Sequence, residues 1–175
     1  MLNVKYLINL DQDNALSLSE NQENLGNAWF IESLVKVENN NQEILMLNEL
    51  DYSKTCLSTM LENKKYEYDS NNSIKLISRK SNELVYEYNS SNENFVVFSE
   101  AFYSKGWESY IDDIKVNHNK VNYLLRGMEV PKGKHNIKFI FNPSVIKKGS
   151  IIMASSNFLL LILIGLYFKR KLAHV

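Results

Sequence analysis

The sequence predicts a mainly β protein: an antiparallel β-sandwich, of jelly-roll or immunoglobulin-like type, with one short helix and a C-terminal transmembrane helix. Short apolar runs rich in aromatic and β-branched residues alternate with polar, turn-forming pieces, which is typical of sandwich strands. Ten Tyr and eight Phe provide large side chains for a β-rich core. The last quarter of the chain passes from an alternating strand into an uncharged apolar run that ends in three cations.

The first part of the β region contains three apolar runs that favour strands and two polar pieces that favour loops or an exposed hairpin. The expected strands are 3–10, 26–37 and 55–60, and the expected polar pieces are 11–24 and 63–73. Between them, Asn39–Asn41 is expected to cap a short helix at Gln42–Leu50. Apolar residues at helical spacing form a stripe along this helix, namely Ile44, Leu45, Leu47 and Leu50.

Further strand-like runs follow at short spacing in the second part, separated by turn-rich pieces. They are 74–79, 84–88, 95–100, 116–126 and 135–142. In the last run Ile137, Phe139 and Phe141 recur at the period of two that a strand requires. The sequence contains no internal repeat and no Gly- or Pro-rich linker, so a single β domain is expected at residues 1–143.

The tail is expected to cross a membrane. Residues 149–168 carry no charge, and about 20 residues suffice to span ~30 Å of hydrocarbon. The three cations Lys169–Lys171 outnumber Lys147 and Lys148 on the other flank, which predicts a cytoplasmic C-terminus. The expected order is an extracytoplasmic β-sandwich, a short tether, a transmembrane helix and a cytoplasmic tail, at 1–143, 144–150, 151–168 and 169–175. A buried core helix or strand is the alternative for the apolar run.

The composition excludes several classes of function. Basic and acidic residues balance at 20 each, so no nucleic-acid partner is expected. The single Cys56 cannot form an intrachain disulfide, and without cationic neighbours it is expected to be an inert core thiol. His118, His135 and His174 are too dispersed for a metal site, and neither a nucleophile elbow nor a phosphate loop is present. The sequence therefore predicts no catalytic residue, no metal and no cofactor.

The segment 99–113 is the best candidate for ligand binding, because aromatic residues lie there among carboxylates. Aromatic faces stack on sugar C–H groups while acids accept hydroxyl protons, as in a glycan-binding groove. The residues expected to contact a glycan are Trp107, Tyr103, Glu100 and Asp112. In the alternative interpretation Trp107 and Tyr103 close one end of the sandwich; a calcium site would lack the spacing of a ligand loop. Arg126 is expected to form an ion pair with Glu100 or Asp112.

Five segments together resemble the C-terminal part of the bacterial YfhO family of membrane proteins, in particular its versions from the Bacteroidetes. They are LNVKYLI at 2–8, LGNAWFI at 25–31, FSEAFYSKGWESYID at 98–112, VNYLLRGMEVPKGKHNIKFIFNP at 121–143 and GSII at 149–152. The resemblance runs in order over nearly the whole chain. Asp113 is a departure, since such proteins usually have Asp-Gly at this hairpin turn, and its effect is expected to be structural.

The resemblance implies a large multi-pass protein of the bacterial cytoplasmic membrane, similar to GT-C glycosyltransferases that use lipid-linked sugars to modify the cell envelope. This chain would be its C-terminal part, with the lipid bilayer and the N-terminal membrane helices as partners. The catalytic acid of such enzymes lies in an early extracytoplasmic loop. No catalytic residue therefore carries over, and this chain alone is not expected to be an active enzyme.

Two hypotheses of function result. In the first, the β domain helps to recognise a glycan or a lipid-linked acceptor. In the second, it is a structural or assembly domain that binds no ligand and packs on membrane helices or on a partner. The burial of Trp107 separates them, because an exposed ring beside carboxylates favours the first and a buried ring favours the second.

Overall fold

The computed structural model describes residues 1–10 and 16–172. The chain is mainly β, as predicted, and divides into two compact units. The first unit, Met1–Phe141, contains all strands of the described residues and is called the β unit below. The second begins at Asn142 and consists of one long helix.

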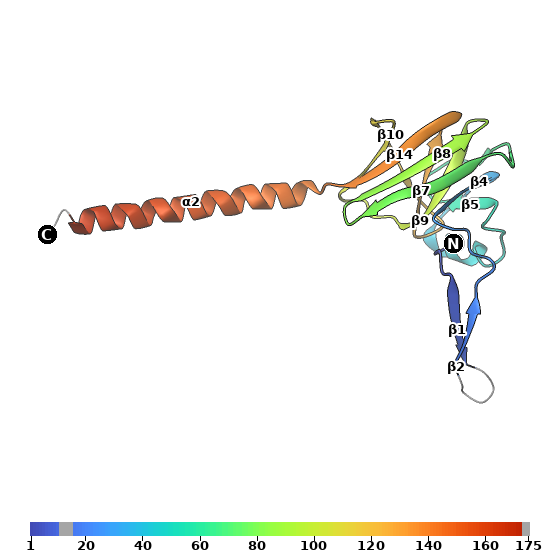
Figure 1. The fold of residues 1–175 in the computed structure, drawn as a ribbon, viewed down its shortest axis with the longest axis horizontal. Helices are drawn as coiled ribbons and strands as arrows, with labels where there is room; N and C mark the ends of the chain where they lie inside the picture. Colours follow the sequence, from blue (N-terminus) through green and yellow to red (C-terminus); the bar gives the residue numbers. More distant parts are fainter. Residues whose placement is uncertain (11–15, 173–175) are drawn as a thin grey trace. The chain divides into compact units, whose positions relative to one another are not determined.

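Two antiparallel sheets form the sandwich of the β unit (Figure 1). The first sheet has five strands in the order β11 (Ile114–Val116), β10 (Trp107–Ile111), β14 (Gly133–Phe141), β8 (Glu83–Ser90) and β7 (Ser73–Lys80). The second has four, in the order β12 (Asn119–Val121), β13 (Leu125–Val130), β9 (Asn94–Ala101) and β3 (Ala28–Phe30). The strands predicted at 74–79, 84–88, 95–100 and 135–142 are therefore confirmed.

Aromatic rings from both sheets meet in the core between them. The ring centroids of Tyr86 and Phe98 lie 5.0 Å apart, and those of Phe98 and Phe139 lie 4.9 Å apart, both pairs edge to face. All three side chains are fully buried. Burial of such rings removes large apolar areas from water, and their edge-to-face contacts add a smaller directional term.

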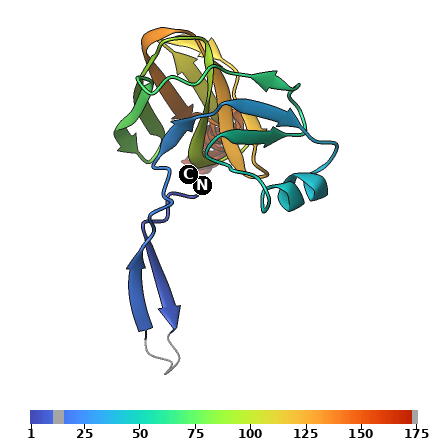
Figure 2. The same cartoon turned by 90° about the vertical axis from the view of Figure 1, so that its right-hand side faces the viewer.

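A third, small sheet covers the outer face of the four-stranded sheet (Figure 2). Its strands are β5 (Thr55–Ser58), β4 (Ser33–Lys36) and β6 (Lys64–Lys65). Because side chains alternate along a strand, Val96 and Phe98 enter the first core while Phe95 and Val97 enter a second one. Strand β9 is thus buried on both faces. The β4–β5 pair is parallel, an exception to the expected antiparallel pattern.

The short helix α1 (Asn40–Met46) is present, but its apolar stripe is not its buried face. Ile44 and Leu45 are exposed, whereas Glu43 is fully buried. The Glu43 carboxylate accepts a 2.8 Å hydrogen bond from the backbone N–H of Tyr123, which lies in a turn with positive φ. The helix begins at Asn39, whose side chain accepts from the N–H of Gln42. A polar contact with a distant turn, invisible in the local pattern, decides which face packs inward.

Several sequence-based boundaries of strands and loops were wrong. The expected loop 11–24 contains strand β2 (Leu16–Glu20), which pairs with β1 (Tyr6–Leu10) as a separate hairpin; residues 11–15 lie outside the described part. The expected strand 26–37 is divided into β3 and β4. The expected strand 116–126 is interrupted by the turn Asn122–Tyr123, where both residues have positive φ. Asparagine tolerates a positive φ, but whether a given asparagine adopts it in a tight turn depends on how the flanking strands pair.

Helix α2 (Ser144–Leu172) forms the second unit. Its part from Ser144 to Leu166, 23 residues, is long and apolar enough to cross a membrane, and none of it is buried within the protein. The residues expected to form a tether, 144–150, are helical and belong to the start of α2. Residues 173–175 of the expected cytoplasmic tail lie outside the described residues.

Candidate functional site

Of the four residues expected to contact a glycan, Trp107 and Tyr103 lie near each other, since both rings contact Phe141, whereas Asp112 lies apart. Trp107 begins strand β10 and Asp112 follows its last residue, which places roughly 16 Å of extended chain between them. Asp112 belongs instead to the β10–β11 turn, where its carboxylate accepts from the N–H of Asn136 at 2.9 Å and lies 2.5 Å from His135 Nδ1. The bond from Asn136, followed by that from His135, lowers the pKa of Asp112. Asp112 is thus occupied in holding a turn.

One face of the Trp107 ring packs against other residues of the β unit. The guanidinium carbon of Arg126 lies 4.3 Å from the Trp107 ring centroid, and the ring of Phe141 lies 5.2 Å away. Arg126 is buried, and its Nε donates to the carbonyl of Ala101 at 2.9 Å. Glu100 forms its ion pair with Arg79, not with Arg126 as expected from the sequence. A cation stacked on the indole occupies the surface that a sugar would need.

The surroundings of Trp107 are closely packed. His118 contacts the rings of Phe102 and Phe139, and its Nδ1 lies 2.9 Å from Ser109 Oγ. Burial, and then the positive charge of Arg126, lower the pKa of His118 to about 4, so this histidine is neutral at pH 7. Trp107 itself is half-buried against the first core. This packing favours the interpretation in which Trp107 closes the sandwich.

Tyr103 is the one exposed ring of the predicted set. Its side chain is 53% exposed, and its ring lies 6.5 Å from that of Phe141. Because Arg126 covers one face of Trp107 and Asp112 lies elsewhere, this cluster makes a weaker site than the sequence suggested. The contacts of Trp107, Tyr103, Glu100 and Asp112 with a glycan remain a prediction.

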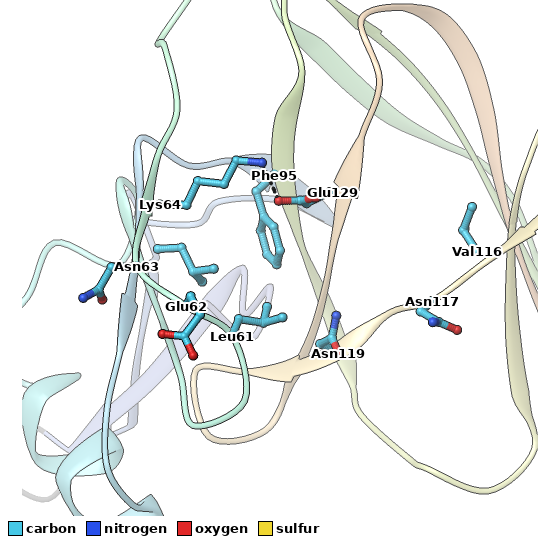
Figure 3. A pocket seen from close by; sticks show the side chains of 10 residues that line it. Leu61, Glu62, Asn63, Lys64, Phe95, Val116, Asn117, Asn119 and Glu129 are labelled. Atoms are coloured by element: carbon cyan, nitrogen blue, oxygen red, sulfur yellow. Dashed lines mark hydrogen bonds and ion pairs between the residues drawn. The ribbon is translucent and has the colours of Figure 1, made fainter.

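A hollow on another side of the β unit has more of the properties of a ligand site (Figure 3). It has a volume of about 430 Å³, within the range of ligand pockets. We call it the amide pocket, because three asparagines contribute to its lining. The lining residues are Leu34, Leu61, Glu62, Asn63, Lys64, Phe95, Val116, Asn117, Asn119 and Glu129. The pocket lies outside the segment 99–113.

A network of charges fixes one side of the amide pocket. Lys64 Nζ donates to Glu129 and to Glu93, both at 2.7 Å, and Tyr66 Oη donates to the same Glu129 oxygen at 2.9 Å. The bond from Lys64 lowers the pKa of Glu129, and burial followed by the bond to Glu129 raises the pKa of Tyr66. Figure 3 shows the Lys64–Glu129 bond above the Phe95 ring. The carboxylate is therefore charged and held in place at neutral pH.

The amides and the apolar residues complete the pocket. Asn63 Oδ1 accepts from the N–H of Lys36 at 2.7 Å, so its NH₂ group is oriented by the backbone. The side chains of Asn117 and Asn119 make no hydrogen bond to other described residues, so their donors and acceptors are available. Leu61 and Val116, both half-buried, supply apolar surface, and the buried Leu34 and Phe95 lie beneath it. Apolar surface with a few polar groups around it is the common composition of a small-molecule site.

Sequence reasoning missed the amide pocket because its residues come from strands or loops far apart in the chain. Asn63 precedes β6, Asn117 and Asn119 lie around the start of β12, and Phe95 and Glu129 belong to paired strands. Read locally, the asparagines indicate turns. Only the packing of the third sheet beside β9 and β13 brings them together. No cluster of three or more metal-ligating side chains occurs within residues 1–10 and 16–172.

Comparison with protein families matches residues 60–153 to a family described as the bacterial membrane protein YfhO. The chain belongs to the YfhO family. The match covers more than half of the chain, from just after β5 through the whole five-stranded sheet into α2. It includes Lys64, Phe95, Asn117, Asn119 and Glu129 of the amide pocket, and it excludes the β1–β2 hairpin. Neither the curated proteins nor the solved structures yielded a match.

Proposed function

We propose that the β unit of this YfhO protein is an extracytoplasmic domain that helps to recognise a glycan or a lipid-linked acceptor during cell-envelope glycosylation. The family and the apolar helix α2 give a membrane location. The amide pocket is the observation that carries the proposal of glycan recognition. The chain would be the C-terminal part of a membrane protein similar to GT-C glycosyltransferases, whose catalytic acid would lie in another part of that protein.

The chemistry of the amide pocket favours a neutral, hydroxyl-rich ligand. Asn117 and Asn119 each offer a donor and an acceptor, which matches the dual character of a sugar hydroxyl. A purely apolar ligand would leave both amides buried and unpaired, which is costly. A strongly charged ligand of either sign would meet a like charge, since Lys64 and Glu129 both line the pocket. The half-buried apolar side chains of Leu61 and Val116 suit the C–H face of a sugar ring.

The proposed orientation places the β unit outside the bacterial cytoplasmic membrane and the C-terminus in the cytoplasm. It rests on the three cations Lys169–Lys171, which follow the uncharged run directly. Positive residues flanking a membrane helix are retained preferentially on the cytoplasmic side. Lys147 and Lys148 on the other flank are fewer.

Binding of oligosaccharides to the full chain in lipid nanodiscs tests the proposal. An array of bacterial envelope oligosaccharides identifies a ligand, and calorimetric titration then measures its dissociation constant. Asn117→Ala and Asn119→Ala are each expected to weaken binding about fivefold, because one hydrogen bond contributes about 1 kcal/mol. Neither side chain makes a hydrogen bond to other described residues, so both variants should remain folded.

Tyr103→Ala is the matched control, because Tyr103 is exposed and does not line the amide pocket. It should leave the dissociation constant unchanged. Loss of binding in Tyr103→Ala, with full binding in both asparagine variants, would indicate that the ligand binds at the segment 99–113 instead of the amide pocket. Absence of binding to every oligosaccharide would contradict glycan recognition as a whole.

A second candidate, a structural or assembly domain without a ligand, is favoured by the environment of Trp107. Its ring is stacked under Arg126 and packed against Phe141, as expected for a residue that closes the sandwich. This candidate predicts that substitutions in the amide pocket affect neither ligand binding nor stability. The two candidates therefore differ in the outcome of the same titration.

A further inference from the structure

Helix α2 carries one amide side chain, Asn157, near the middle of its uncharged run. At about 1.5 Å of rise per residue, Asn157 lies roughly 13 Å along the helix from Lys148 and roughly 18 Å from Lys169. The hydrocarbon core of a bilayer is ~30 Å thick. An α2 helix that crosses the membrane with these flanking cations at its two surfaces therefore holds Asn157 near the centre of the hydrocarbon.

The Asn157 amide has no partner, in contrast to the two serines that precede it. Ser155 Oγ donates to the carbonyl of Ile151 at 2.8 Å, and Ser156 Oγ donates to the carbonyl of Met153 at 2.9 Å. The Asn157 side chain makes no hydrogen bond to any residue of 1–10 or 16–172. Acyl chains offer neither donors nor acceptors, and an unpaired amide among them is costly. Asn157 therefore requires a protein partner inside the membrane.

Most residues on the Asn157 side of α2 are small. Ser150 and Ala154 precede Asn157 by seven and three residues and Gly165 follows it by eight, which places them on one side of a helix with 3.6 residues per turn. Together with Leu161 they form a surface that we call the Asn157 face, and all five residues are exposed. Small residues let the backbones of two membrane helices approach closely, so that a short amide can reach across. The opposite side carries larger residues, namely Ile152, Leu159, Leu163 and Leu166.

We propose that the Asn157 face binds helix α2 of a second copy of the chain, in a parallel pair whose two Asn157 amides bond to each other. Two copies of one chain cross the membrane in the same direction, so a two-fold pair brings both amides to the same depth. Each amide has donors and an acceptor, so the two can bond reciprocally. Any other helix would have to carry its own polar group at this level. Within the described residues α2 is the one candidate span.

The cations at the ends of α2 oppose this pairing only weakly. A parallel pair brings Lys148 and Lys169 near their copies in the second chain. These side chains reach the headgroup level, where water and ions screen like charges, and their long stems allow the ammonium groups to move apart. The amides lie where no solvent can replace their bond. The attraction at the centre is therefore the stronger of the two effects.

Disulfide cross-linking of the full chain in isolated bacterial membranes tests which side of α2 is paired. Ser150→Cys, on the Asn157 face, is expected to give a cross-linked dimer when copper phenanthroline is added. Ile152→Cys, at nearly the same depth on the opposite side, is the control and should remain monomeric. The native Cys56 is fully buried and burial raises the pKa of its thiol, so it should not react.

Sedimentation equilibrium of the full chain in a neutrally buoyant detergent tests the role of the amide. Asn157→Ala keeps the face small and removes only the hydrogen bond, so the dissociation constant of the dimer should rise about threefold to tenfold. Ser155→Ala is the matched control, because its hydroxyl already bonds to its own helix, and it should leave the constant unchanged. Asn157→Gln, which retains an amide, should restore most of the affinity.

Three outcomes would overturn the proposal. A wild-type chain that stays monomeric in detergent and forms no cross-link through Ser150→Cys would mean that a different helix supplies the partner of Asn157. Equal cross-linking at 150 and 152 would indicate random collision. A dimer with the same dissociation constant in Asn157→Ala as in the wild type would assign the contact to another surface. None of these results depends on whether the amide pocket binds a glycan.

Discussion

At the scale of single residues, Trp107 fits a ligand-binding pattern in the sequence but has a packing role in the structure. Its neighbours in the sequence suggested a sugar-binding groove, whereas its neighbours in space are Arg126 and Phe141. Cys56 met its expectation, since it is buried and burial raises the pKa of its thiol. Glu43 did not, because a buried carboxylate was not expected on a helix with an apolar stripe. Its partner, the N–H of Tyr123, lies in a distant turn.

Trp107→Ala is expected to lower the free energy of unfolding of the β unit by about 3 kcal/mol, the lower end for a truncated large aromatic residue, because the ring is only half-buried. Fluorescence of the remaining Trp29 during denaturation in detergent measures the loss, since the chain has no other tryptophan. Tyr103→Ala, on an exposed ring, should change stability by less than about 0.5 kcal/mol. Wild-type stability of Trp107→Ala would remove the structural role assigned to this ring.

At the scale of secondary structure, long strands were predictable and short ones were not. Strands β7, β8, β9 and β14 have eight or nine residues, and an alternating or continuous apolar pattern marks each of them. Strands β3, β11 and β12 have three residues, too few for any periodicity to emerge. Their existence depends on the partner strand, and their boundaries are set by turns such as Asn122–Tyr123.

Strand β13 contains a glycine, Gly127, that is needed because a larger residue would not fit beside its neighbours. A Cβ atom at Gly127 would lie 2.4 Å from Cε1 and 2.8 Å from Cζ of the buried Phe95 ring. Gly127→Ala is therefore expected to destabilise the β unit by about 1–3 kcal/mol through overpacking. It should also weaken ligand binding, because the displaced ring lines the amide pocket. Denaturation followed by tryptophan fluorescence measures the first effect.

Gly149→Ala is the control for this substitution, because an added methyl group at Gly149 meets nothing within 4 Å. It should leave unfolding of the β unit unchanged. A Gly127→Ala variant as stable as the wild type would mean that the Phe95 ring moves aside without cost, and the tight fit between β13 and β9 would then not matter.

At the scale of the whole molecule, the chain combines a β unit with a helix suited to a membrane. Because the chain belongs to the YfhO family, both units are parts of a bacterial membrane protein. The distribution of apolar and polar residues in each unit suits the surroundings expected for it, water for the β unit and lipid for α2. The β unit alternates apolar and polar residues on its outer strands, whereas the candidate span of α2 has apolar side chains exposed around its circumference.

The proposed topology predicts the reactivity of two introduced cysteines in spheroplasts. Lys105→Cys, on the surface of the β unit, should react with a membrane-impermeant maleimide in intact spheroplasts. Ala173→Cys, after the cations that follow the apolar run, should react only after permeabilisation. Wild-type protein, with only the buried Cys56, gives the background. The reverse pattern of labelling would place the β unit in the cytoplasm.

The sequence by itself determined the β class of the chain, the long strands and the apolar helix, because these depend on patterns within a few consecutive residues. The tertiary structure decided which side chains meet. In the folded protein, strand β10 separates Trp107 from Asp112, and Glu100 forms an ion pair with Arg79. Asn63, Asn119 and Glu129 come together around one pocket. Register and the packing of three sheets fix these distances, and both arise from contacts between residues far apart in the chain.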